Sequence, residues 1–130
     1  NSLLFEQNGS WPIQWAIAGV QRMTLQTNGN LDVTGDVTSD NFILSSDKRY
    51  KSSIEPLLPY RIKLDWRQYE MKGKKRFGVI AQELEKEHPE FVQTNEQGFK
   101  SVAYIDLLVA KNAELESRIE RLESILKNLL

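Results

Sequence analysis

The sequence predicts an α+β fold in which a short, shaft-like β segment leads into a small mixed α+β unit and then into one long coiled-coil helix. Three observations predict this order. Apolar and polar residues alternate between Met23 and Val37, the composition changes abruptly at Ser46, and apolar residues recur at heptad spacing from Ile105 to Leu129. We therefore expect the segments 1–45, 46–104 and 105–130 to be three structurally different parts.

The first part, 1–45, contains short runs of alternating residues separated by turn sequences. The alternating apolar residues are Met23, Leu25, Leu31, Val33 and Val37, and the turns are Asn28-Gly29-Asn30 and Gly35-Asp36. Strands this short and polar bury little apolar surface within one chain, so they are stable mainly when copies wind around one another. A loose edge sheet of an ordinary domain is the alternative, and Trp11, Pro12 and Trp15 fit both interpretations as packing residues.

Charge and composition exclude several classes of partner. Residues 1–45 carry five charged residues with a net charge of -3, whereas the remaining 85 residues carry 30, and the whole chain has a net charge of -1. Such a balance gives no field that attracts nucleic acid or an anionic membrane, so neither is expected as a partner. There is no cysteine, and we expect no metal or other cofactor. The start at Asn1 suggests a piece of a longer protein.

The middle part reads as strands and one short helix. Ile62, Leu64 and Trp66 alternate as a strand, and a turn at Lys72-Gly73-Lys74-Lys75 leads into Phe77-Gly78-Val79-Ile80. Residues 81–88 have helix-forming composition and stop at Pro89. A hairpin is expected from 91–94 and 99–102, joined by Asn95-Glu96-Gln97-Gly98. The single histidine, His88, is expected to cap the helix or lie on the surface.

The last part has an unbroken heptad pattern with spacings of three and four. The a positions are Ile105, Asn112, Ile119 and Leu126, and the d positions are Leu108, Leu115, Leu122 and Leu129. Lys111 and Arg118 fall at g, and Glu116 and Glu123 at e, which suits salt bridges between neighbouring parallel helices. A lone Asn in the seam with Leu at d favours two strands by itself, and a single helix packed on its own domain is the alternative.

Four separated blocks together resemble a known family. They are Ser46-Asp47-x-Arg49-x-Lys51 followed by Ile54, then Phe77-Gly78-Val79-Ile80-Ala81-Gln82-Glu83, then Pro89-Glu90-Phe91-Val92, and then Val102-Ala103-Tyr104 before the coiled coil. In this order they resemble the C-terminal intramolecular chaperone domain of phage tail-spike, tail-fibre and neck-appendage proteins, of the endosialidase type. The segment 1–45 resembles the triple-stranded β shaft (a triple β-helix) that such domains fold.

The resemblance implies an intertwined homotrimer whose terminal domain registers three chains and then cuts itself off. It implies Ser46 as the nucleophile, Lys51 as its general base and Ser45–Ser46 as the scissile bond, with Asp47 and Arg49 in supporting roles. The protein would then be a single-turnover, self-cleaving serine endopeptidase with no external substrate. Its partners would be its own copies and the upstream fibre shaft. Assembly would occur in the host cytoplasm, with the shaft retained in the virion and the chaperone released.

The chemistry of this pair sets a physical condition. A serine hydroxyl is a poor nucleophile until a base takes its proton, and a lysine can do so only as a neutral amine. Burial or a cationic neighbour has to displace the proton from Lys51, and Lys48 and Arg49 are candidate neighbours. Either Ser46 Oγ attacks the carbonyl of Ser45, or Lys51 assists an attacking water; the first route is the one we favour.

The spacing of five residues adds a further constraint. It places the two side chains about 140° apart on a helix and on opposite faces of a strand, so neither regular element unites them. A turn at Asp47-Lys48 can fold Lys51 back, or Lys51 can come from a neighbouring chain. The competing interpretation of the whole protein is a structural or receptor-binding trimeric tip that is never cut. An enzyme acting on outside substrates has little support.

Overall fold

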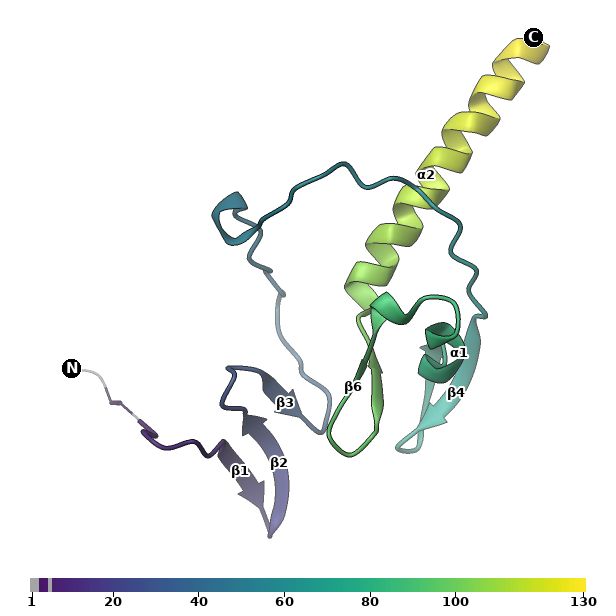
Figure 1. Ribbon diagram of the computed structural model, residues 1–130. Helices are drawn as coiled ribbons and strands as arrows, with labels where there is room; N and C mark the ends of the chain where they lie inside the picture. The colour runs from purple at the N-terminus through teal and green to yellow at the C-terminus, as the bar shows by residue number, and fades with distance from the viewer. Residues whose placement is uncertain (1–2, 5) are drawn as a thin grey trace. The chain divides into compact units, whose positions relative to one another are not determined.

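The computed structural model describes residues 3–4 and 6–130, which divide into two compact units, 1–52 and 53–130 (Figure 1). The first unit holds strands β1, β2 and β3 and the 3-10 helix η1. The second holds strands β4 to β7, helix α1, the 3-10 helix η2 and the long helix α2. Within the described residues, no helix is both long enough and apolar enough to cross a membrane.

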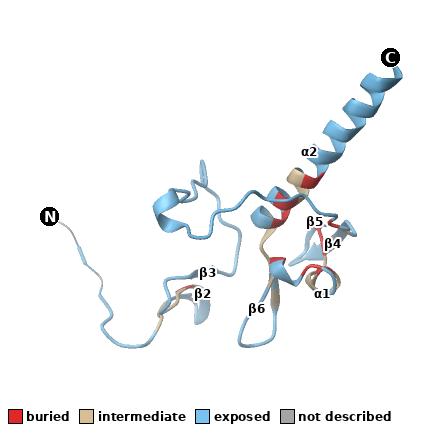
Figure 2. Ribbon diagram, turned by 45° about the horizontal axis from the view of Figure 1, so that its top comes forward, coloured by how far each residue is buried: buried red, intermediate tan, exposed pale blue. Residues whose placement is uncertain are grey.

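The first unit is a three-stranded antiparallel sheet in the order β1-β2-β3. Its strands are β1 (Ile13–Ile17), β2 (Val20–Leu25) and β3 (Leu31–Val33). Ala18 and Gly19 join β1 to β2 with positive φ angles of 50° and 74°, as a two-residue hairpin turn requires. Thr24 is the one buried residue among those described in this unit, so the sheet has almost no core of its own. Figure 2 shows its ribbon mostly in the pale blue of exposed residues.

The strand prediction for residues 23–44 is correct in part. The alternating runs around Met23 and Leu31 form the end of β2 and all of β3, but Val37 and residues 41–44 lie in chain without regular structure. Strand β1 was not predicted at all. A strand needs a hydrogen-bonded neighbour, and β3 finds one in β2, whereas the segment around Val37 pairs with no strand among the described residues. Phe42, Ile43 and Leu44 are therefore exposed.

The second unit begins with an extended segment and a hairpin. The predicted strand at residues 62–66 is wrong, because β4 begins later, spanning Arg67–Met71, and pairs with β5 (Lys74–Gly78). The turn between them is where the sequence placed it: Lys72 and Gly73 have φ angles of 52° and 75°. Ile62 is fully buried without a strand partner, since side chains of α2 satisfy its backbone groups.

Helix α1 and the second hairpin follow. Helix α1 spans Ala81–Glu85, shorter than the predicted 81–88, and is followed by η2 (Pro89–Phe91). The hairpin of β6 (Val92–Thr94) and β7 (Lys100–Val102) confirms the predicted one to within a residue. The surface role expected for His88 is wrong: this residue is only 8% exposed, and its ring lies between those of Tyr60 and Phe91.

Helix α2 (Tyr104–Leu129) completes the core of the second unit. Leu107 and Ala110 pack with four buried residues from earlier in this unit: Ile62, Val79, Leu84 and Phe91. In Figure 2 the buried residues of α2 lie in its first half, and its second half is exposed throughout. The helix thus uses its N-terminal turns to hold the unit together and extends the rest beyond that core.

Candidate functional site

Ser46 and Lys51 meet within one chain. Lys51 Nζ donates a hydrogen bond to Ser46 Oγ over 2.7 Å. Of the two arrangements that the spacing left open, the structure has the one in which the chain itself folds the lysine back. The roles predicted for these two residues are chemical and remain predictions, but the contact that such roles require is present.

A single 3-10 turn creates this contact. The turn η1 spans Lys48–Tyr50, with Asp47 before it and Lys51 after it, both in extended conformation. Its hydrogen bonds run from Tyr50 N to Asp47 O at 3.0 Å and from Lys51 N to Lys48 O at 3.1 Å. The turn reverses the chain between the two extended residues, so side chains that neither a helix nor a strand would unite come to the same side.

Asp47 and Arg49 bind each other at the start of this turn. Asp47 Oδ1 accepts hydrogen bonds from Arg49 N at 2.9 Å and from Arg49 Nε at 3.0 Å, and Oδ2 accepts one from Nη2 at 2.8 Å. Asp47 is therefore both the N-cap of the turn and one half of a bidentate ion pair. The hydrogen bonds from Arg49 lower the pKa of Asp47, and the same contact raises the pKa of Arg49.

This pairing changes the role expected for Arg49. As a candidate cationic neighbour it was to repel the charge of Lys51, but its guanidinium is bound to the Asp47 carboxylate. Opposite charges in contact largely cancel at a distance, so Arg49 presents little net positive field to Lys51. Every residue from Ser46 to Lys51 is exposed, so these six residues do not bury the lysine either.

The heptad seam on α2 is the second predicted feature. Its apolar members are between 41% and 78% exposed, and Asn112 is exposed as well. The helix packs on its own unit through Leu107, Ala110 and Glu114, none of which belongs to the seam. Packing within the chain therefore leaves the whole seam unpartnered.

Both cations at the g positions, Lys111 and Arg118, also have contacts within their own chain. Lys111 Nζ contacts Glu114 Oε2 at 2.8 Å and Ile62 O at 2.7 Å, and Arg118 lies 3.8 Å from Glu114. Both cations were expected to pair with glutamates of a neighbouring helix. Glu114 is nearly buried one turn away, at the c position, and the heptad pattern gave no sign of its role.

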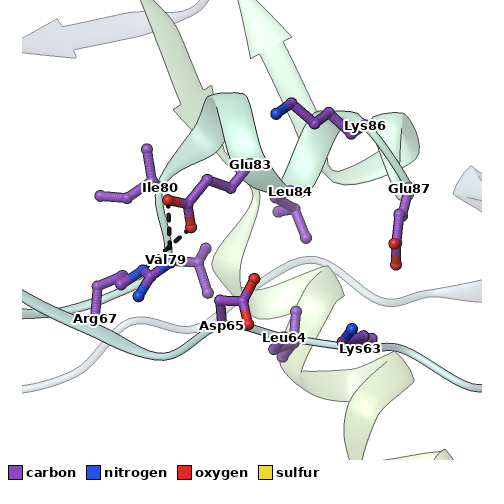
Figure 3. A pocket seen from close by; sticks show the side chains of 10 residues that line it. All are labelled: Lys63, Leu64, Asp65, Arg67, Val79, Ile80, Glu83, Leu84, Lys86 and Glu87. Atoms are coloured by element: carbon purple, nitrogen blue, oxygen red, sulfur yellow. Dashed lines mark hydrogen bonds and ion pairs between the residues drawn. The ribbon is translucent and has the colours of Figure 1, made fainter.

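A cleft of about 300 Å³ lies in the second unit, between the segment before β4 and helix α1 (Figure 3). Its floor includes Leu64, Val79 and Leu84, and its rim includes the ion pair of Arg67 with Glu83 at 3.2 Å. Neither Ser46 nor Lys51 lines it. Among the described residues, no group of three or more histidine or acidic side chains is arranged to hold a metal ion.

A comparison with protein families finds one match. Residues 46–93 match the model of a peptidase family that is described as chaperone of endosialidase. The match begins at Ser46 itself and continues through η1, β4, β5 and α1 to the start of β6. Searches of curated proteins and of solved structures found no match.

Proposed function

We propose that this chain brings three copies of a fibre shaft into register and then cuts the Ser45–Ser46 bond. The match of residues 46–93 to the chaperone-of-endosialidase family supports the role of intramolecular chaperone. The observation that carries the self-cleavage is the 2.7 Å contact of Lys51 Nζ with Ser46 Oγ at the first residue of the matched segment.

The proposed reaction proceeds in two steps. In the first, neutral Lys51 takes the proton of Ser46 Oγ, which attacks the carbonyl carbon of Ser45. The bond from that carbon to the nitrogen of Ser46 breaks, the nitrogen takes the proton from Lys51, and an ester joins Ser45 to Oγ. In the second, water hydrolyses the ester, leaving the carboxylate of Ser45 and the free hydroxyl and amine of Ser46.

Assembly supplies the condition that the single chain lacks. The contact of Lys51 Nζ with Ser46 Oγ lies in an exposed turn, and a lysine acts as a base only after it has lost its proton. All residues from 46 to 51 are exposed, so cover by neighbouring copies would favour loss of the proton. Cutting would thus follow alignment of the three chains, and the shaft would be released only once it is in register.

The exposed seam of α2 provides the means of alignment. Seven apolar seam residues and Asn112 project from one helix and are not needed for the core of their own unit. Three such helices would bury these residues against one another and raise the local concentration of the attached shaft ends. The sheet of the first unit, which lacks a core, would gain partners in the same event. We place this assembly in the host cytoplasm, with the shaft kept in the virion and the chaperone lost.

A structural or receptor-binding tip that is never cut is the second candidate, and the exposure of Lys51 favours it, since the single chain does not supply the burial that would favour loss of the lysine proton. Intact mass of the freshly expressed protein separates the two candidates. Self-cleavage yields an 85-residue fragment, residues 46–130, in the wild type but not in Ser46→Ala or Lys51→Ala. Light scattering of the uncut Ser46→Ala protein gives the number of chains.

Hydroxylamine tests the route. It converts an ester at Ser45 into a hydroxamate, whereas direct attack by water offers no ester to trap. An intact wild-type mass at every pH from 6 to 10, in a protein shown to be trimeric, would rule out self-cleavage.

A further inference from the structure

We propose that Asp47 and Arg49 form a clamp that positions Ser46 against Lys51 for the cleavage reaction, an inference that rests on the proposed function. The Asp47–Arg49 clamp consists of three hydrogen bonds between 2.8 and 3.0 Å, two of them from the guanidinium and one from the backbone of Arg49. Arg49 is a positioning residue in this proposal, because it acts through Asp47 and contacts neither reacting group.

The clamp lies between the two residues whose distance matters. Asp47 follows Ser46 directly and fixes where the turn begins, and Lys51 is the residue at which the turn ends. A single 3-10 turn has only two backbone hydrogen bonds here, and such short helices are weak by themselves. The clamp adds three more bonds around the same turn and therefore restricts the direction in which both flanking side chains project.

The exposure of the site makes this restriction important. Residues 46–51 have no buried side chain that could hold them in place by packing. Hydrogen bonds within the turn are thus the means by which this segment can keep Lys51 Nζ within 2.7 Å of Ser46 Oγ. A misplacement of reacting groups by about 1 Å can lower a rate by about 100-fold, so even an exposed clamp matters to the reaction.

The fork of the guanidinium is the feature that separates this role from that of a plain positive charge. Arg49 reaches both oxygens of Asp47 at once, through Nε and Nη2. A lysine keeps the charge but cannot form two parallel bonds with one carboxylate. If Arg49 served as the cation that drives the proton off Lys51, Arg49→Lys would retain the function, whereas a clamp would lose it.

The experiment measures the rate of cleavage against pH for the whole chain, by intact mass, in the wild type, Arg49→Lys, Arg49→Ala and Asp47→Ala. Lys63→Gln is the control, because it removes an exposed positive charge outside the turn without changing the clamp. We expect Arg49→Lys to cut about 10-fold more slowly than the wild type or worse at every pH, with an unchanged midpoint of the pH profile. Lys63→Gln should cut like the wild type.

Two further measurements exclude a general loss of structure and test the pairing. Trimer mass and the unfolding temperature should be the same in all variants, since the clamp lies in an exposed turn. The double variant Asp47→Ala/Arg49→Ala should be no slower than Asp47→Ala alone, because the pair acts as a unit.

A wild-type rate for Arg49→Lys, or a midpoint of its pH profile that moves to higher pH, overturns the clamp while leaving self-cleavage intact. A wild type that is never cut overturns both the clamp and the proposed function.

Discussion

Glu114 on helix α2 accepts a hydrogen bond from the backbone N–H of Ile62 at 3.0 Å, although 52 residues separate the two in the sequence. Lys111 completes the arrangement, since its Nζ contacts both Ile62 O, at 2.7 Å, and Glu114 Oε2, at 2.8 Å. Two side chains of one helix thus take the place of a neighbouring strand. This is why Ile62 is fully buried within an extended segment that belongs to no sheet.

Removing the Glu114 carboxylate should therefore destabilise the second unit. Glu114→Ala leaves the N–H of Ile62 without its acceptor and the largely buried Lys111 without its carboxylate partner, and loss of one partner of such an ion pair costs about 3 kcal/mol or more. Urea unfolding followed by circular dichroism measures the loss. Glu120→Ala, on the exposed part of the same helix, is the control and should change stability by less than about 0.5 kcal/mol. Equal effects of the two substitutions would contradict the role of Glu114.

The same pair predicts how stability depends on pH. The hydrogen bond from Lys111 is the main cause that lowers the pKa of Glu114 below its ordinary value of 4.5, with help from the Ile62 N–H. A carboxyl whose pKa is lower when folded contributes stability above its unfolded value, and this contribution is lost as the pH falls through the folded value. We expect the wild type to lose its advantage over Glu114→Gln as the pH drops below about 4.5. An advantage that is as large at pH 3 as at pH 7 would contradict this.

The sequence predicted the two hairpins of the second unit from their turns. The turns at Lys72-Gly73 and around Gly98 contain residues that adopt positive φ, and the hairpins β4–β5 and β6–β7 form where those turns lie. Helix α2 follows the heptad pattern over its whole length. The segment at Ile62 was misread as a strand because Ile62 and Leu64 face the core while Trp66 is exposed, and the hydrogen-bond partners of Ile62 lie 49 and 52 residues away.

The candidate site was predictable in its residues but not in its geometry. The residue types of Ser46 and Lys51 indicate the chemistry, and Asp47 indicates a turn. The direction in which the Lys51 side chain projects depends on whether Arg49 binds Asp47 or faces the lysine. Residue types alone do not decide between these two arrangements. The contact of Lys111 with Glu114 was missed for a similar reason, because the heptad pattern does not show which side chains of the same helix meet the buried segment at Ile62.

Gly78 is required where β5 approaches the start of α2. A Cβ at this position would overlap the hydroxyl of Tyr104, whose oxygen accepts a hydrogen bond from Val79 N at 3.0 Å. Gly78→Ala should destabilise the second unit by about 1–3 kcal/mol, as overpacking of a close contact does. Tyr104→Phe removes the hydroxyl, so the double variant should lose less stability than the sum of the single variants. Additive losses, measured by urea unfolding, would show that the hydroxyl is not the obstacle.

Two leucines of α2 should have different functions, because they lie on different faces of the helix. Leu122 belongs to the seam and is 64% exposed, whereas Leu107 is fully buried in the core of its own unit. Leu122→Asp should place a charge in the interface of the proposed trimer and reduce the mass in light scattering from that of the proposed three chains to that of a single chain of 15.0 kDa. The strands and the hydrophobic core of the second unit should stay folded in this variant, because no seam residue contributes to them.

Leu107→Ala should have the opposite result. It leaves the seam unchanged but opens a cavity beneath α2, at a cost of about 2–5 kcal/mol in unfolding free energy.

Ser117→Asp is the control for the charge that Leu122→Asp adds. It lies on the side of the helix away from the seam and should leave the mass at three chains. If Leu122→Asp retained three chains while folding normally, the seam would not be the surface that aligns the copies. If Leu122→Asp instead gives single chains, we expect cleavage to stop, and cleavage that continues in those single chains would show that cutting does not depend on alignment.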